Sequence, residues 1–452
     1  MNSLYKFLKD NVLLSHVALV TQILLGLSIA NSSHALPTFA RQTGQNCVAC
    51  HAGGQFPELT PYGRMFKLTG YTIGERTTPI SVMGLVAGSK MSNIDAVNTS
   101  LSNNNAPATL STPLKNGALR FETASLFLAG KITDNIGAFT QITYDNYGLA
   151  NANGDNVVGH TSADNMDFRW ADQIVSPTSD MIYGVSLNNG PSVSDPWNTS
   201  WAWSNYVPAT GGIGSNAYLD ATTAYPNSGL PGKGYAGLTG YLYLNKNYYA
   251  ELGFYKTASK NLRFLNARND QMDSYLKGAN NPYWRFAYTK DWGAHNLMVG
   301  TSGMLSKSLD TGLTNFTTAD FTDSANYQRV KSAGVDSQYQ FLLDPHTVTA
   351  QFSYQKQSTD PSLNNTTTTS TNTNMLRVKG SYVYLAKYGG SMSYFNLNGD
   401  DSNTQQGKTL EVFYMPIQYV RAGIQYTNYM KLPYIDRPSD ANTLRFYVWT
   451  AY

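Results

Sequence analysis

Cysteine and charge are both scarce in this sequence, and each scarcity excludes a class of protein. Cysteine occurs only at positions 47 and 50 of 452 residues, which excludes a fold held together by several disulfides. Charged residues make up 13% of the chain and the formal net charge is +3, so the composition gives no reason to expect a nucleic-acid partner. Beyond residue 35 there is no apolar run of about 18 residues, which excludes a further membrane-spanning helix.

Tyrosine and glycine, by contrast, are plentiful, with 32 and 38 residues respectively, and asparagine and threonine are frequent. Low charge, many tyrosines and the lack of long apolar segments are together typical of a β-barrel that contacts the lipid of a bacterial outer membrane. The composition therefore favours an all-β membrane protein.

Residues 1–35 have the features of a secretory signal peptide. Lys6 and Lys9 precede an apolar run over residues 12–30, and a small-residue cleavage site ends at Ala35. The apolar run is also long enough to be an uncleaved anchor helix, which remains the alternative. The segment predicts export from the cytoplasm in either case.

Both cysteines belong to one motif, Cys47-Val48-Ala49-Cys50-His51. This C-x-x-C-H spacing lets two thiols reach the two vinyl groups of one haem while the following imidazole ligates the iron. We therefore predict one covalent haem c, attached through Cys47 and Cys50, with His51 as the proximal iron ligand. A redox dithiol would need a βαβ context, a disulfide across two residues is strained, and a zinc site would need further Cys or His residues nearby.

Residues 36–78 form the predicted haem-binding segment. Thr60 and Pro61 predict the N-cap and first position of a short helix that ends at Gly70. The segment is too short to enclose a haem by itself, so we expect other parts of the chain to cover the cofactor. Its aromatic residues are candidates for the walls of the site: Phe56, Tyr62, Phe66 and Tyr71.

The second axial position and the haem propionates also need partners. Met65 is the candidate distal ligand, because methionine is a common partner of histidine in cytochromes c. An open sixth position, or one of the distant residues His160, His295 and His346, remains an alternative. The propionate candidates within the segment are Arg41, Arg64 and Lys67. Inward-facing cations farther along the chain either serve the same purpose or line a wet pore: Arg285, Arg377, Lys379, Arg421 and Arg445.

Residues 79–452 alternate apolar and polar side chains with a period of two, as strands with one lipid-facing side do. About sixteen such runs occur, and the connections between them are alternately short and long. Outer-membrane barrels have tight periplasmic turns and long external loops, which predicts an antiparallel barrel of about sixteen strands. The final strand ends on the aromatic Tyr452 and resembles the signal for outer-membrane barrel assembly.

The alternation of loop lengths also predicts where the haem-binding segment enters. If the short turns are periplasmic, the first strand begins at the periplasm, and the segment before it is free to fold into the lumen as a plug. The longest connection, residues 189–234, carries several tryptophans and either folds over the barrel mouth or packs as ordinary core and interface.

Several stretches resemble the fused cytochrome–porin family of bacterial outer membranes, whose best-known members are iron oxidases. They are residues 39–44 (FARQTG), 47–51 (CVACH), 56–68 (FPELTPYGRMFKL), 182–189, 195–199 and 281–285. The resemblance covers nearly the whole chain after the signal peptide. It implies a single-haem plug in a barrel of about sixteen strands, which takes electrons from an external donor, often Fe(II), and passes them to periplasmic cytochromes. Cys47, Cys50 and His51 match the family motif.

The sequence thus favours an outer-membrane electron conduit, with Fe(II):cytochrome c oxidoreductase activity as a possible enzymatic role. No catalytic constellation other than the haem motif is present. Two alternatives stay open. One is a diffusion porin with a structural or regulatory haem plug, and the other is a soluble periplasmic cytochrome with a β-rich partner domain.

Overall fold

The computed structural model describes residues 38–54, 58–104, 120–150, 157–197, 234–266, 275–310, 323–365, 369–399 and 404–452. All of them belong to one compact unit, Pro37–Tyr452. The predicted signal peptide, Phe56 and most of the 189–234 connection lie outside the described residues.

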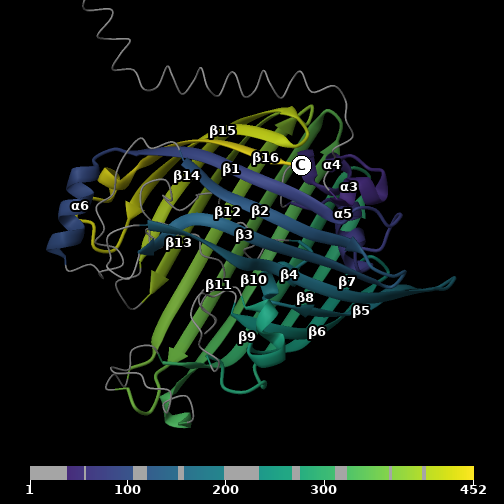
Figure 1. Cartoon of the computed structure of the whole chain (residues 1–452), viewed down its shortest axis with the longest axis horizontal. Helices are drawn as coiled ribbons and strands as arrows, with labels where there is room; N and C mark the ends of the chain where they lie inside the picture. Colours follow the sequence, from purple (N-terminus) through teal and green to yellow (C-terminus); the bar gives the residue numbers. More distant parts are fainter. Residues whose placement is uncertain are drawn as a thin grey trace, which may run out of the picture. The chain divides into compact units, whose positions relative to one another are not determined.

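Sixteen antiparallel strands close into a barrel in which each strand pairs with its neighbours in sequence and β1 pairs with β16 (Figure 1). The predicted all-β class and strand number are confirmed. The strands are β1 (Ile80–Met91), β2 (Arg120–Lys131), β3 (Ile136–Ala150), β4 (Val157–Val175), β5 (Asp180–Asn188), β6 (Tyr235–Leu244), β7 (Tyr248–Thr257), β8 (Pro282–Trp292), β9 (His295–Leu309), β10 (Tyr327–Leu343), β11 (His346–Asp360), β12 (Thr371–Tyr384), β13 (Tyr388–Gly399), β14 (Gln405–Ile417), β15 (Val420–Lys431) and β16 (Thr443–Ala451).

Short helices precede the barrel or lie in its connections. Those of the segment predicted to bind haem are α3 (Thr38–Thr43), α4 (Cys47–Cys50), the 3₁₀ turn η1 (Ala52–Gly54) and α5 (Pro61–Leu68). The connections contain α6 (Ile94–Asn103), α7 (Pro191–Ser194), η4 (Lys260–Leu265), η6 (Ser324–Asn326) and η7 (Pro438–Ala441). None of these described helices is long and apolar enough to cross a bilayer.

Several of the expected loops contain regular structure, most extensively the stretches 147–164 and 91–117. β4 begins at Val157, inside the stretch 147–164 that we expected to be a loop, so His160 belongs to a strand. The first part of β4 has few apolar residues and therefore lacks the alternating pattern, although it pairs with β3. α6 occupies part of the expected loop 91–117, and its N-cap Asn93 accepts a hydrogen bond from the backbone N–H of Ala96.

The two faces of the barrel differ sharply in polarity. Outward-facing apolar side chains are exposed, with 57% exposure for Leu252 and 62% for Val412. Inward-facing neighbours are polar and buried, among them Gln338, Gln340 and Arg285. An apolar outer face and a polar interior are the arrangement of a barrel that contacts lipid.

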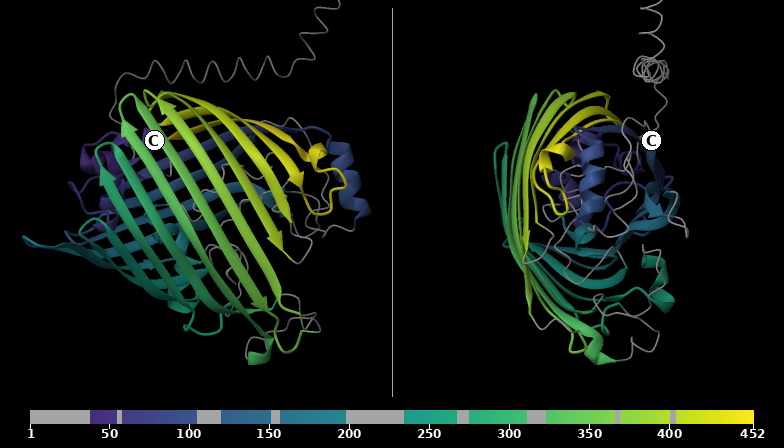
Figure 2. Two further views of the ribbon diagram at one scale, coloured as in Figure 1. Left: turned by 180° about the vertical axis from the view of Figure 1, so that it is seen from behind. Right: turned by 90° about the vertical axis from the view of Figure 1, so that its left-hand side faces the viewer.

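The short turns, such as residues 132–135, 245–247 and 344–345, occur at one end of the barrel, where α3, α4 and α5 also lie (Figure 1). α5 contacts the inner wall directly. The Tyr241 hydroxyl of β6 donates to the Leu68 carbonyl oxygen at 2.7 Å, and the Tyr71 hydroxyl donates to Asp167 of β4 at 2.6 Å. Strands β9 to β15 form the wall seen from behind in Figure 2.

Candidate functional site

The cysteine motif folds as a single helical turn. Cys47 and Cys50 stand at the first and last positions of α4, three residues apart and therefore on one face of the turn. His51 follows in extended backbone, and its N–H donates to the Cys47 carbonyl oxygen at 2.8 Å. The two thiols are not bonded to each other. The local fold thus presents two free thiols and an imidazole next to one another.

α5 holds this turn in place through backbone contacts. Thr60 caps α5 by accepting a hydrogen bond from the Gly63 N–H at 3.1 Å, while its own N–H donates to the Cys50 carbonyl oxygen at 2.9 Å. The Thr60 hydroxyl also donates to the carbonyl oxygen of Ala49. Gly63 permits the close packing, because a Cβ at this position would lie 2.2 Å from the Cys50 carbonyl oxygen. The predicted cap and helix start at Thr60 and Pro61 are confirmed.

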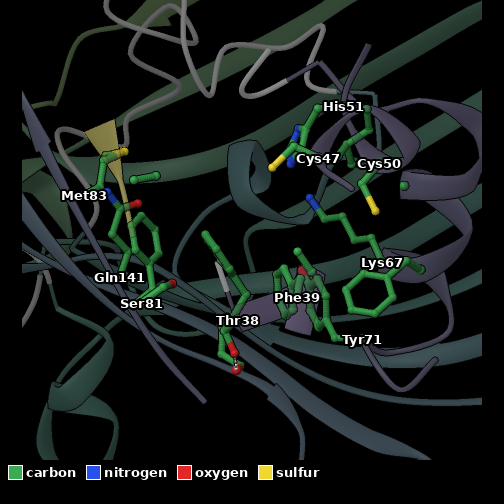
Figure 3. Close-up of a pocket in the computed structure, with 18 of the residues that line it drawn as sticks. Thr38, Phe39, Cys47, Cys50, His51, Lys67, Tyr71, Ser81, Met83 and Gln141 are labelled. Atoms are coloured by element: carbon green, nitrogen blue, oxygen red, sulfur yellow. Dashed lines mark hydrogen bonds between the residues drawn. The ribbon is translucent and has the colours of Figure 1, made fainter. Parts of the chain in front are cut away.

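The motif faces a cavity of about 210 Å³ at the short-turn end of the barrel (Figure 3). Cys47, Cys50 and His51 line one side of it. The remaining walls come chiefly from α3, α5, β1, β2, β3 and β16, with Asn165 of β4 and Ser192 and Val193 of α7. Six aromatic residues contribute to the lining: Phe39, Phe66, Tyr71, Phe127, Phe139 and Trp449. The ring of Phe39 stacks on Tyr71 at 5.5 Å and meets Phe66 edge-on at 4.8 Å.

Burial keeps the three polar groups of the motif in their neutral forms. It raises the pKa of the Cys47 thiol, and burial together with the neighbouring Cys47 raises the pKa of Cys50 to about 11. Burial also lowers the pKa of His51 to about 4, so the imidazole is neutral above that pH. A neutral imidazole is the form that ligates a metal. Redox dithiols require a lowered thiol pKa, which is the opposite of what this site produces.

The residues present fit a covalently attached haem. Two thiols on one helical turn, a half-buried neutral imidazole next to them and a cavity lined in part by aromatic rings match the needs of a flat, largely apolar porphyrin. Among the described residues no group of three or more His, Cys, Asp or Glu is placed to hold a metal ion, so a zinc site gains no support there.

Of the three propionate candidates in the segment, the structure brings only Lys67 to the cavity. Its ammonium donates to the Asp195 carbonyl oxygen at 2.8 Å, and burial lowers its pKa to about 8. Arg41 instead donates to the backbone carbonyl oxygens of Thr78 and Ile80. Arg64 fastens α5 to the barrel wall, with hydrogen bonds of 2.6 Å to Asn296, 3.2 Å to Gln338 and 3.1 Å to Gln340.

Met65, the candidate distal ligand, is not among the residues that line the cavity. It packs against a separate buried cluster that contains Leu68, Ile182 and Trp197. His295 and His346 are not in the lining either, and their Nδ1 atoms share hydrogen bonds with the hydroxyls of Tyr339 and Tyr382. The side chain of His160 lies outside the described residues.

The barrel cations face inward as expected, but they do not line the cavity. Arg285 pairs with Asp336 at 2.7 Å, and Arg421 pairs with Glu411 at 2.7 Å. Lys379 pairs with Glu58 of the haem-binding segment. These cations therefore have partners within the protein.

Sequence reasoning missed the cavity residues that the barrel itself contributes, chiefly Met83 of β1, Gln141 of β3 and Trp449 of β16. The alternation of β1 does place Met83 on the inward face together with Ser81 and Ala87. Alternation does not show which inward-facing residues of a strand lie at the same level in the barrel as the helices before β1.

No known family model matches the sequence, and no curated protein does. Comparison with solved structures finds distant similarity to barrels. The outer membrane channel DcaP of Acinetobacter baumannii has a TM-score of 0.43 and 12% identity, covering 82% of this chain and 96% of that one. Salmonella typhi OmpF has a TM-score of 0.42 and 10% identity, with coverage of 82% and 97%. For the anion-selective porin of Comamonas acidovorans the values are 0.40, 12%, 82% and 99%. These similarities are too distant to assign a family or a function.

Proposed function

We propose that the protein is an outer-membrane electron conduit of the fused cytochrome–porin type. In this proposal one haem c, bound covalently by Cys47 and Cys50 in the lumen of the barrel, receives electrons from an extracellular donor such as Fe(II), and periplasmic cytochromes accept them. The observation that carries the proposal is the aromatic cavity that meets both thiols and the imidazole at the short-turn end of the barrel. The apolar outer face of the closed barrel supports the membrane location.

Several residues of the cavity have defined tasks in this proposal. Cys47 and Cys50 attach the cofactor, and His51, neutral through burial, binds the iron. Lys67 places a cation at the cavity wall, where it favours the anionic propionates. The aromatic walls would cover part of the porphyrin surface. When bound, the haem supplies a one-electron redox centre.

A filled lumen beside α5 favours the conduit over an open diffusion pore. Arg285 and Asp336 are 0% and 3% exposed as side chains, and the Asp195 carboxylate lies 3.4 Å from Arg285. Trp197 covers the Arg285 guanidinium at 5.6 Å and is itself 1% exposed. At this level these side chains pack against one another and are shielded from water.

Reduction by Fe(II) tests the proposal directly. The oxidised, detergent-solubilised protein, expressed with the machinery for cytochrome c maturation, is mixed with Fe(II) without oxygen, and the ferrous haem bands are followed. We expect rapid reduction, and re-oxidation on addition of a soluble ferric cytochrome c. If covalent haem is present but Fe(II) leaves it oxidised across the pH range in which the barrel is stable, iron is not the donor.

The second candidate is a diffusion porin in which the haem segment is a structural or regulatory plug, and the closed sixteen-strand barrel favours it. Conductance in planar bilayers separates the two functions. Large, steady single-channel currents from the haem-loaded protein would support the porin, whereas a closed barrel supports the conduit.

A further inference from the structure

A six-coordinate haem needs a ligand from the face opposite its histidine, and the cavity restricts the choice. Methionine, histidine, cysteine and tyrosine are the usual axial ligands. Among the described residues in the lining, these types are His51, the two cysteines, Tyr71 and Met83. Because Cys47 and Cys50 attach the porphyrin and His51 is the proximal ligand, Tyr71 and Met83 remain.

The other polar side chains with suitable atoms are engaged elsewhere. The Tyr71 hydroxyl donates a 2.6 Å hydrogen bond to Asp167, which also binds Arg169 at 2.7 Å. The Lys67 ammonium donates to the Asp195 carbonyl oxygen and belongs to α5, the helix that packs directly on the cysteine turn. A ligand for the opposite face has to come from another element.

Met83 comes from such an element. It lies on the inward face of β1, and Figure 3 shows it on the opposite side of the cavity from His51. Its neighbours in the sheet are small, Ser125 on β2 and Ala451 on β16. It also packs against the cluster that contains Tyr447 and Trp449, and the three rotatable bonds of its unbranched thioether let it adopt other positions beside those rings.

Met65 lies on the wrong face of its helix for this role. Gly63, Phe66 and Lys67 are spaced three and four residues apart, which places them on the face of α5 that lines the cavity. Met65 falls outside that spacing and packs with Leu68 against the barrel wall. Met65 could reach the cavity only if α5 rotated about its axis. Such a rotation would break the hydrogen bonds of Arg64 to Asn296 and Gln338.

We propose that Met83, and not Met65, is the second axial ligand of the haem, an inference that rests on the covalent haem proposed above. The coordination sphere is then built from two parts of the chain, His51 in the segment and Met83 in the first strand. Folding of the segment against β1 would complete it.

Spectroscopy of matched variants tests this assignment in the full-length, haem-loaded protein. Ferric haem with histidine and methionine ligands has a weak far-red sulfur-to-iron charge-transfer band, and its ferrous form has a strongly upfield-shifted methionine methyl proton resonance. We expect both signals in the unchanged protein and in Met65→Leu. We expect both to be absent in Met83→Leu, together with much faster carbon monoxide binding to the ferrous iron. Met83→His should restore six-coordinate, low-spin haem without the band and with a lower potential.

Three outcomes would overturn the assignment while leaving the covalent haem intact. They are a haem-loaded protein that lacks both methionine signals, persistence of the signals in Met83→Leu, and their loss in Met65→Leu. The proposed function has a separate criterion. If mass spectrometry finds no haem on Cys47 and Cys50 after maturation, the cofactor itself is absent. If the Met83 variants fail to fold, both signals in the unchanged protein and their persistence in Met65→Leu would still support Met83, because Met83 is the methionine among the described residues that line the cavity.

Discussion

The two sides of α5 differ in how their space is used. On one side, Gly63, Phe66 and Lys67 face the cavity of about 210 Å³ next to the cysteine motif. On the other, Met65 and Leu68 pack against a cluster that includes Trp197, which covers the buried Arg285–Asp336 pair. One side is filled by the protein's own groups and the other is hollow and aromatic. The contrast shows that the two sides of α5 differ in how tightly the described residues pack around them.

The largest effect is expected from removing both thiols. In the double variant Cys47→Ser and Cys50→Ser we expect complete loss of covalent haem, measured by intact mass and by haem staining of denaturing gels. The barrel strands make no use of these thiols, so heat-modifiable gel migration should still report a folded barrel. Val48→Ser, a change at a neighbouring residue that is 37% exposed, is the control and should keep the haem. Covalent haem in the double variant would contradict the role of the motif.

The Asp336→Ala variant tests the buried ion pair in the packed region on the other side of α5. Removing this carboxylate leaves the buried Arg285 without its bidentate partner, which we expect to lower the free energy of unfolding by about 3–5 kcal/mol. Asp360→Ala is the matched control, because its ion pair with Lys331 is exposed and we expect about 0–1 kcal/mol. Unfolding in urea with detergent measures both. Equal effects of the two variants would show that the buried pair is unimportant, and a rise in bilayer conductance in Asp336→Ala would identify the pair as part of the seal.

Sequence patterns predicted the barrel well because its determinants are local. The period-two alternation of side chains and the alternation of short and long loops depend only on neighbouring residues and on the fact that one face contacts lipid. The haem motif is likewise local, because the chemistry requires a fixed spacing between Cys47, Cys50 and His51. The helix start at Thr60 follows from capping, which involves residues three positions apart.

The remainder of the site depends on contacts between distant parts of the chain. Alternation places Met83 on the inward face, but only closure of β1 onto β16 brings it beside Trp449 at the level of the cysteine turn. The choice of Met65 was based on sequence proximity, whereas the orientation of α5 is set by the hydrogen bonds of Arg64 to β9 and β10. Arg41 and Arg64 were predicted from charge alone, which does not distinguish a ligand contact from a structural one.

The Gly63→Ala variant tests the packing on the side of α5 that faces the cavity. In Gly63→Ala the new methyl group would lie 2.2 Å from the Cys50 carbonyl oxygen, so α4 and α5 must separate. We expect a loss of about 1–3 kcal/mol and an altered haem spectrum, since both helices line the cavity. Gly380→Ala is the control, because no atom lies within 4 Å of the added carbon. If the two variants behave alike, the close approach of the helices at Gly63 does not constrain the site.

The smallest effect concerns the Thr60 cap. Thr60→Ala removes the hydroxyl that accepts from Gly63 and donates to Ala49, and we expect a loss of about 1 kcal/mol. Asn93→Ala removes an N-cap of α6 and should have a similar energetic effect. Only the Thr60 change should also perturb the haem spectrum, because only this cap bonds to the cysteine turn, and Thr60→Ser should restore it. A spectrum that changes equally in the Asn93 variant would mean that helix stability in general, rather than the link between α4 and α5, controls the geometry of the cavity.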